Sequence, residues 1–227
     1  MLLELLFPGR CLLCGGELAF SAGRGGPLCL DCRETLRPLE GSRRCEVCSL
    51  PLLSERRLCT RCRRREYEFE SNLSLFEYRG AIREVLYQFK FRNRLRLAGL
   101  LAAPAAAVLK ARFPGATLVP APANPQAVAR RGWDPVERIC RILEHSYGFP
   151  TCRALERLAG PPQKLLGYEE RRRNLRGTIR LRRAPAAELV LLDDVFTTGA
   201  TASECARVLK QGGACRVRAL SLAIDVP

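Results

Sequence analysis

The sequence of 227 residues is poor in histidine and has no long apolar segment. Its only histidine, His145, follows Glu144 on a predicted helix and is expected at the surface, so no residue can be named as a general base. No apolar run approaches the roughly 18 residues that a membrane span requires. The opening MLLELLFPGR contains Glu4, lacks a basic leader and is too short for a signal peptide. We therefore expect a cytoplasmic protein without membrane insertion.

A nucleotide-binding P-loop is also absent, although a related arrangement occurs near the C-terminus. The run Leu189–Leu192 is continuous and apolar, which predicts a strand buried on both faces within a parallel sheet. Asp193 and Asp194 follow it, at the end of the strand where open α/β sheets bind ligands. Thr-Thr-Gly-Ala-Thr (197–201) then leads into a predicted helix that stops at Gly212-Gly213, without the Gly-Lys-Ser/Thr ending of a P-loop.

This stretch combines two carboxylates with a site for an anion. Short hydroxyl side chains, Gly199 and a helix N-terminus gather free backbone N–H groups and the positive end of a helix dipole around one point, which favours phosphate. The adjacent carboxylates can bind sugar hydroxyls. A ligand that carries both features is a phosphorylated ribose.

The order of strand, Asp-Asp, Thr-Thr-Gly-x-Thr and helix resembles the signature of the type I phosphoribosyltransferases. The resemblance implies that Asp193 and Asp194 hold the ribose 2′ and 3′ hydroxyls of 5-phosphoribosyl pyrophosphate (PRPP). It also implies that the 5′-phosphate is bound by the loop Thr197, Thr198, Gly199, Ala200 and Thr201.

Eight of the twelve cysteines lie before residue 63, in four Cys-x-x-Cys pairs. Each pair supplies two thiolates from one tight turn, which in a cytoplasmic protein favours tetrahedral zinc over disulfides. We expect two structural zinc ions, because four thiolates leave no open position on the metal; redox activity of the pairs is the alternative. Sequential grouping assigns Cys11, Cys14, Cys29 and Cys32 to one ion and Cys45, Cys48, Cys59 and Cys62 to the other, and interleaved grouping stays open.

The formal net charge is +15, and two zinc ions bound by eight thiolates would reduce it to roughly +11. This excess fits a phosphate-rich substrate or a nucleic acid, and solubility alone could also account for it. The basic run 61–65 is followed by Glu66, Glu68 and Glu70. Such a change of sign is typical of a solvated linker, so we expect a double zinc ribbon at 1–66 and a second domain at 67–227.

The second domain alternates predicted strands and helices, which indicates an α/β fold with a parallel sheet. Pro104 should kink or restart one of these helices. Strands are expected within 74–80, 116–123, 151–158, 178–181, 189–192 and 217–224, and helices within 81–91, 95–113, 134–148 and 201–213, with a further short helix at 2–7.

Three further stretches resemble successive blocks of the ComF family, which comprises competence-associated phosphoribosyltransferase-like proteins with an N-terminal double zinc ribbon. They read FEYRGAIREVLYQFKF, VPAPANPQAVARRGWDPV and PPQKLLGYEERRRNLRG, and the resemblance extends over nearly the whole chain. It implies a type I phosphoribosyltransferase fold, a mostly parallel sheet flanked by helices. It also implies a pyrophosphate-binding loop at Ala121, Pro122, Ala123 and Asn124. A flexible hood over the site is implied within 160–177, with Gln163, Arg171 or Arg172, and Asn174 at matching positions and Lys164 beside them.

The chain departs from the family's pattern at one place. The usual Arg-Gly-Phe-Asn-Gln is replaced by Arg131-Gly132-Trp133-Asp134-Pro135, so any contacts of the two amides are in question. Trp133 retains an aromatic ring, which could stack on a base or fill the core.

Phosphoribosyl transfer passes through a ribosyl cation as pyrophosphate leaves, so it depends on anion stabilisation and an ordered sugar. Mg²⁺ held by pyrophosphate and ribose oxygens is the expected cofactor. The acids would position the ribose, and the hood would close to exclude water. Cations that could neutralise pyrophosphate, or be ordinary surface cations, are Lys90, Arg131, Lys164 and Arg171. The cysteines outside the pairs lie in apolar stretches and are expected to be core thiols: Cys140, Cys152, Cys205 and Cys215.

Three functions remain open from the sequence. The first is an enzyme that transfers a phosphoribosyl group to an unidentified acceptor, which the intact Asp-Asp and Thr-Thr-Gly-Ala-Thr favour. The second is a PRPP-sensing or scaffold protein that holds single-stranded DNA or a helicase partner during DNA uptake, which the competence association favours. The third is a structural zinc module fused to an inactive fold. Neither the acceptor nor the oligomeric state can be inferred.

Overall fold

The computed structural model describes residues 9–18, 26–39, 43–53, 57–159 and 173–226. The helix expected at 2–7 and the hood residues Gln163, Lys164, Arg171 and Arg172 lie outside these ranges. Within them, the structure contains no helix with the length and apolarity that a membrane span needs.

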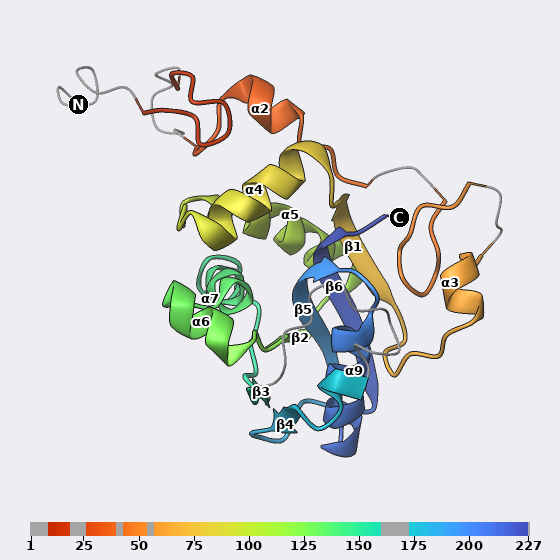
Figure 1. Cartoon of the computed structure of the whole chain (residues 1–227). Coiled ribbons are helices and arrows are strands. Elements are labelled where there is room, and N and C mark those ends of the chain that lie inside the picture. Colours follow the sequence, from red (N-terminus) through yellow and green to blue (C-terminus); the bar gives the residue numbers. More distant parts are fainter. Residues whose placement is uncertain (1–8, 19–25, 40–42, 54–56, 160–172, 227) are drawn as a thin grey trace.

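A parallel sheet of four strands forms the centre of the fold (Figure 1). Its strands lie in the order β1-β6-β5-β2, and each neighbouring pair is parallel. This arrangement confirms the α/β class that the alternation of strands and helices predicted. The strands are β1 (Asn72–Glu77), β2 (Thr117–Pro120), β5 (Glu188–Phe196) and β6 (Arg216–Ile224).

Apolar side chains cover both faces of this sheet. In β5, Val190 and Leu192 belong to one buried cluster, and Leu189 and Leu191 belong to the other. Successive side chains of a strand point to opposite faces, so a strand covered on both sides needs an unbroken apolar run. The burial of β5 therefore agrees with its sequence pattern.

Several helices cover one face of the sheet (Figure 1), whereas a single helix and a group of cysteines pack on the other. The face of Val190 and Leu192 packs against α4 (Gly80–Phe91), α5 (Leu97–Arg112) and α7 (Pro135–Tyr147). The opposite face packs against α9 (Ala200–Gln211) and the cysteines between 45 and 62. Cys11 belongs to the cluster of α4 and α5, so the two cysteine groups pack against opposite faces of the sheet.

The helix α6 (Pro125–Arg131) was not predicted, because no helix was expected between the strand at 116–123 and the helix at 134–148. The side chain of Asn124 accepts a hydrogen bond from the N–H of Gln126 at 2.9 Å, and Pro125 occupies the first turn. Gly132 ends the helix at a φ of 84°. Asn-Pro therefore begins a short helix here. Two other short helices, α2 (Leu30–Glu34) and α3 (Thr60–Arg63), were also missed.

Pro104 neither ends α5 nor divides it, so the expected restart is not observed. The strand expected at 151–158 is also different. Thr151 forms an isolated bridge with Leu118, whereas β3 (Leu155–Arg157) pairs antiparallel with β4 (Ile179–Leu181) in a separate sheet. These two strands flank the hood segment in the sequence.

The segment that was expected to be a solvated linker packs against the sheet domain. Phe69 is only 3% exposed, and Tyr67 stacks on it with ring centroids 4.8 Å apart. Phe196 meets Phe69 edge-on at 5.9 Å. The prediction was wrong because it weighed the charges alone; in the sequence 66–70, glutamates alternate with aromatic residues, which allows one side to be buried.

The cysteines outside the pairs are only in part core thiols. Cys140 and Cys205 are buried as expected, but Cys152 is half-buried and Cys215 is exposed. Cys215 immediately precedes β6, after the turn that ends α9, which explains its access to solvent. His145 is exposed, in agreement with the sequence analysis.

Candidate functional site

The acidic pair lies at the carboxyl-terminal edge of the sheet, within β5 rather than after it. The strand was expected to end at Leu192, but Asp193 pairs in register with Ser221 and the strand continues to Phe196. The backbone N–H of Asp194 donates a hydrogen bond to Oδ1 of Asp193 at 2.8 Å. The two carboxylates keep the position at which open α/β sheets bind ligands.

One cation from another element contacts this pair and a second lies near it. Nζ of Lys90, near the end of α4, lies 2.6 Å from Oδ2 of Asp194. Arg131, the last residue of α6, donates from Nε to the carbonyl oxygen of Lys90 at 2.6 Å. Burial lowers the pKa of Arg131, and the charge of Asp194 acts in the opposite direction. The structure thus brings together three of the residues expected to act on the ligand.

The carboxyl group of Asp193 is poorly solvated. Burial, reinforced by the charge of Asp194, raises its pKa to about 7, although Lys90 acts in the opposite direction. This carboxyl group therefore stays protonated to a higher pH than an ordinary aspartate does. In that state it can either donate a hydrogen bond to a sugar hydroxyl or accept one from it.

The loop expected to bind pyrophosphate lies beside the acids. The N–H of Ala121 donates to the carbonyl oxygen of Leu192 at 2.8 Å. Asp134 fixes the loop, because its Oδ2 accepts a hydrogen bond from the N–H of Ala123 at 3.2 Å. Its Oδ1 accepts from the first N–H groups of α7, at 2.8 and 3.2 Å. Asp134, one of the three residues that depart from the family pattern, therefore connects the loop to α7.

Trp133 packs at the edge of the core. Its ring lies 4.8 Å from that of Phe89, and its Nε1 donates to Oδ1 of Asn93 at 2.7 Å. The guanidinium group of Arg131 lies 5.6 Å from the ring centre. These contacts agree with the role of filling the core; within the described residues they do not test stacking on a base.

The loop expected to bind phosphate connects β5 to α9. Gly199 is the residue before the helix and has a φ of 81°, a conformation that side chains other than glycine rarely adopt. A Cβ atom at this position would lie 2.7 Å from ring atoms of Phe196 and of Tyr67. α9 begins at Ala200, so its unpaired N–H groups adjoin the loop. Thr197, Thr198 and Thr201 are half-buried.

The far end of the expected hood is anchored next to this loop. Asn174 is half-buried, and the neighbouring Leu175 is fully buried against Ala200. The N–H of Gly177 donates to Oε1 of Glu204 on α9 at 3.2 Å. The described end of the expected hood therefore contacts α9 through Leu175 and Gly177.

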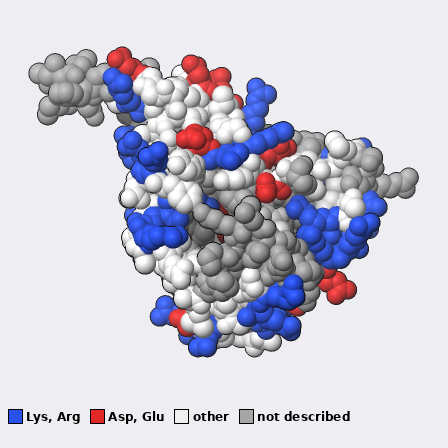
Figure 2. All heavy atoms as spheres, in the orientation of Figure 1, with Lys and Arg blue, Asp and Glu red and all other residues white. Residues whose placement is uncertain are grey.

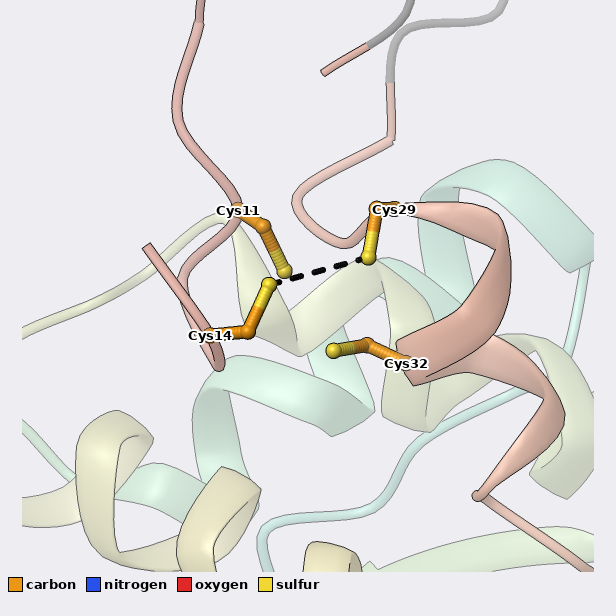
Figure 3. A group of neighbouring side chains, drawn as sticks. All are labelled: Cys11, Cys14, Cys29 and Cys32. Carbon is orange, nitrogen blue, oxygen red and sulfur yellow. Dashed lines mark hydrogen bonds between the residues drawn. The ribbon is translucent and has the colours of Figure 1, made fainter. Parts of the chain in front are cut away.

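The paired cysteines form two compact groups, and within each group all Sγ atoms lie within 4.8 Å of one another. The Sγ atoms of Cys14 and Cys29 are 3.8 Å apart, and those of Cys48 and Cys59 are 3.7 Å apart. A zinc ion with four Zn–S bonds of about 2.3 Å requires a sulfur–sulfur separation of about 3.8 Å, so both groups fit the metal. In Figure 3 the first four side chains point toward one centre. The grouping is sequential: Cys11, Cys14, Cys29 and Cys32 form one group, and Cys45, Cys48, Cys59 and Cys62 form the other.

The chain is similar to known proteins in its N-terminal part and over most of its length. Residues 2–63 match the family model of the double zinc ribbon domain. The DNA utilization protein YhgH of Salmonella typhi is 30% identical over 225 residues, which cover 94% of this chain and 96% of that protein. The chain belongs to the ComF family. Competence protein ComFC of Streptococcus pneumoniae is 28% identical over 94% of this chain and 99% of that protein. Competence protein F of Haemophilus influenzae is 24% identical over 96% and 97%, respectively.

Two contacts of this ComF-family chain with the loop expected to bind phosphate were not predicted, one from the second zinc ribbon and one from the segment that follows it. Nη1 of Arg61 donates to the carbonyl oxygen of Thr197 at 2.9 Å, and the hydroxyl group of Tyr67 donates to that of Thr198 at 3.1 Å. No local sequence pattern predicts either contact, because the partners are more than a hundred residues apart in the sequence.

Arg157 is a further residue near the site that was not predicted. It is the last residue of β3, directly before the hood segment. Burial lowers its pKa, and the charge of Asp193 is among the influences acting in the opposite direction. Its Nε is buried and has no hydrogen-bond partner within the described ranges. Its position in the sequence could have indicated it, because Arg157 is a cation just before the polar segment that was expected to cover the site.

Proposed function

We propose that this protein binds PRPP together with Mg²⁺ and transfers its phosphoribosyl group to an acceptor, in the cytoplasm and in connection with DNA uptake. The observation that supports the proposal most strongly is the arrangement at the end of β5. Lys90 contacts an acidic pair at the end of β5. The pair is followed by a loop that contains Gly199 in the left-handed conformation and by the N-terminus of α9. Such an arrangement suits a ligand with sugar hydroxyls and a phosphate.

The proposed reaction breaks the bond between ribose C1 and pyrophosphate and forms a bond from C1 to the acceptor. Asp193 and Asp194 would order the ribose, and the loop from Thr197 to Thr201 would hold the 5′-phosphate. Lys90 and Arg131 would neutralise the departing pyrophosphate together with the backbone of Ala121–Asn124. These roles are consistent with the proximity of Lys90, Arg131 and Asp194.

The acidic pair is compatible with Mg²⁺, which prefers oxygen ligands and often binds through carboxylates and substrate phosphates. Bound Mg²⁺ would supply positive charge to the leaving pyrophosphate. The names of the relatives, which refer to DNA utilization and competence, support the link to DNA uptake.

Calorimetric titration of the zinc-loaded protein with PRPP and Mg²⁺ tests the proposal. We expect binding by the wild type and none by the Asp193→Asn/Asp194→Asn protein. The matched control is Glu188→Gln, because Glu188 lies at the opposite end of β5 and forms ion pairs at the surface with Arg216 and Arg218. Absence of PRPP binding by the wild type would contradict the proposal. Release of pyrophosphate with candidate acceptors then identifies the second substrate.

A non-catalytic role as PRPP sensor or scaffold is the second candidate. It is supported by the names of the relatives, by the net charge of +15, and by the Lys and Arg side chains that gather on the side of α3 in Figure 2. The partner would be single-stranded DNA or a helicase. Salt-dependent binding of single-stranded DNA that Asp194→Asn leaves unchanged, without turnover of PRPP, would favour this candidate over the enzyme.

A further inference from the structure

Arg61 connects the second zinc ribbon to the phosphate loop. It lies on α3, between the zinc-binding residues Cys59 and Cys62, so its backbone position depends on the metal site. Its Nη1 donates to the carbonyl oxygen of Thr197 at 2.9 Å. No carboxylate within the described ranges forms an ion pair with it, and its Nε and Nη2 are buried without hydrogen-bond partners there.

The segment after α3 makes three more contacts around the same loop. The hydroxyl group of Tyr67 donates to the carbonyl oxygen of Thr198 at 3.1 Å. Its ring occupies the space that a side chain at position 199 would need. The N–H of Glu68 donates to Oγ of Ser203 on α9 at 3.0 Å. The loop and the start of α9 are thus held by residues that follow the second zinc ribbon directly.

The hydrogen bonds to the carbonyl groups of Thr197 and Thr198 also fix the direction of backbone N–H groups in the loop. In a trans peptide group the C=O and N–H bonds point in opposite directions. When Arg61 fixes the carbonyl of Thr197, it fixes the N–H of Thr198 on the other side of that peptide. Tyr67 does the same for the N–H of Gly199. These N–H groups belong to the loop that the proposed function assigns to the 5′-phosphate, and N–H groups already aligned bind an anion with less loss of entropy.

We propose that the second zinc ribbon and the segment that follows it act as a clamp, which holds the loop 197–201 through the positioning residues Arg61 and Tyr67. Affinity for the ligand's phosphate then depends on zinc in this ribbon. The proposal rests on the proposed function for the identity of the ligand. The order of the loop itself can be tested without any ligand.

The first test measures hydrogen exchange of the amides between residues 197 and 203 in the ligand-free, zinc-loaded protein. We expect exchange about tenfold faster in Arg61→Ala, the effect of losing one hydrogen bond from a charged donor, and a smaller acceleration in Tyr67→Phe, which keeps the ring. Arg57→Ala is the control, because Arg57 belongs to the same ribbon but pairs with Glu46 at the exposed surface. Zinc content is measured for each protein. If Arg61→Ala loses zinc, Tyr67→Phe decides the test. Unchanged exchange in both variants overturns the clamp.

The second test is calorimetric titration with PRPP and Mg²⁺. We expect affinity at least tenfold lower in Arg61→Ala, partial recovery in Arg61→Lys, and wild-type affinity in Arg57→Ala. Equal affinity of wild type and Arg61→Ala overturns the clamp. If the wild type does not bind PRPP while Arg61→Ala still accelerates exchange, the proposed function is overturned, and the positioning of the loop by the ribbon is supported.

Discussion

Nζ of Lys90 lies 2.6 Å from Oδ2 of Asp194, which joins the end of α4 to the end of β5. Both side chains are largely withdrawn from solvent, with exposed fractions of 17% and 23%. Ion pairs in such a setting are screened less by water and salt than surface pairs are. Lys90 therefore balances the acidic pair in the free protein and is within reach of an anionic ligand bound there.

Replacement of Lys90 by Met tests this role. The change keeps most of the volume of the side chain and removes its charge, so we expect affinity for PRPP to fall at least tenfold, about 1.4 kcal/mol. Lys110→Met is the control, since Lys110 is at the far end of α5 and lies over the ring of Tyr147. An affinity that Lys90→Met leaves unchanged would mean that the ion pair serves the fold alone.

The raised pKa of Asp193 predicts a dependence of stability on pH. Its pKa in the folded protein is about 7, above the ordinary value of 3.8. The folded state therefore binds this proton more tightly than the unfolded state, and the resulting stabilisation is present at low pH and is lost as the pH rises toward about 7.

Urea unfolding of the wild type and of Asp193→Asn at several pH values between about 5.5 and 8 measures the effect. The stability of the wild type relative to Asp193→Asn should decrease over this interval, because the amide does not titrate. Effects of pH on the zinc sites are common to both proteins and cancel in the difference. A difference that stays constant with pH would show that the carboxyl group titrates well below this range.

The part of the fold that could be predicted from the sequence is the part governed by local pattern. The unbroken run Leu189–Leu192 requires burial on both faces, and the Cys-x-x-Cys spacing predicts two groups of four thiols. Lys90 and Arg131 were named only as cations that could neutralise pyrophosphate; both lie near the acids, and their role stays a prediction. The sheet order β1-β6-β5-β2 depends on pairings between distant strands, which no local pattern specifies.

What the sequence did not predict are contacts between distant segments. Tyr67 and Phe69 were overlooked in a segment that was interpreted by its charge, although they alternate with glutamates. Arg61 was one of several arginines in a run, and nothing in the run distinguishes the one that meets Thr197 from those that face solvent. For Asp134, the prediction considered only the loss of the family's amide. In the structure, its carboxylate accepts hydrogen bonds from the first N–H groups of α7 and caps that helix.

The close packing around Gly199 predicts that Gly199→Ala is much more harmful than the same change at another glycine of positive φ. A Cβ atom at 199 would overlap ring atoms of Phe196 and Tyr67 at 2.7 Å. Gly148, which ends α7 at a φ of 75°, has nothing within 4 Å of such an atom. We expect Gly148→Ala to cost about 1 kcal/mol through backbone strain. Gly199→Ala should cost about 2–4 kcal/mol and abolish PRPP binding. Urea unfolding and calorimetry measure both, and equal costs for the two changes would rule out the steric explanation.

The two zinc sites should differ in their importance for the sheet domain. The second group is fully buried and shares its cluster with Phe69, Leu191 and Phe196, whereas in the first group only Cys11 is buried and Cys14 is exposed. We expect Cys48→Ser to release one zinc ion and to lower the thermal stability of the whole protein. Cys14→Ser should release the other ion and leave the unfolding of the sheet domain nearly unchanged. Zinc content and thermal unfolding followed by hydrogen exchange in β5 distinguish the two. Equal losses would show that both ribbons support the sheet alike.

Asp134 joins the start of α7 to the loop at Ala123, so its replacement should affect both stability and ligand binding. Asp134→Ala removes the cap and should cost about 1–2 kcal/mol of stability. It should also weaken PRPP binding, since the loop expected to hold pyrophosphate loses its anchor. Asp134→Asn restores the residue usual in the ComF family and retains a side-chain oxygen for the cap, so its stability should be within about 0.5 kcal/mol of the wild type. Urea unfolding and calorimetry of both variants provide the measurement. If Asp134→Asn is as unstable as Asp134→Ala, the charge of Asp134 matters more than its geometry, and the departure from the family pattern is an adaptation of this chain rather than a neutral exchange.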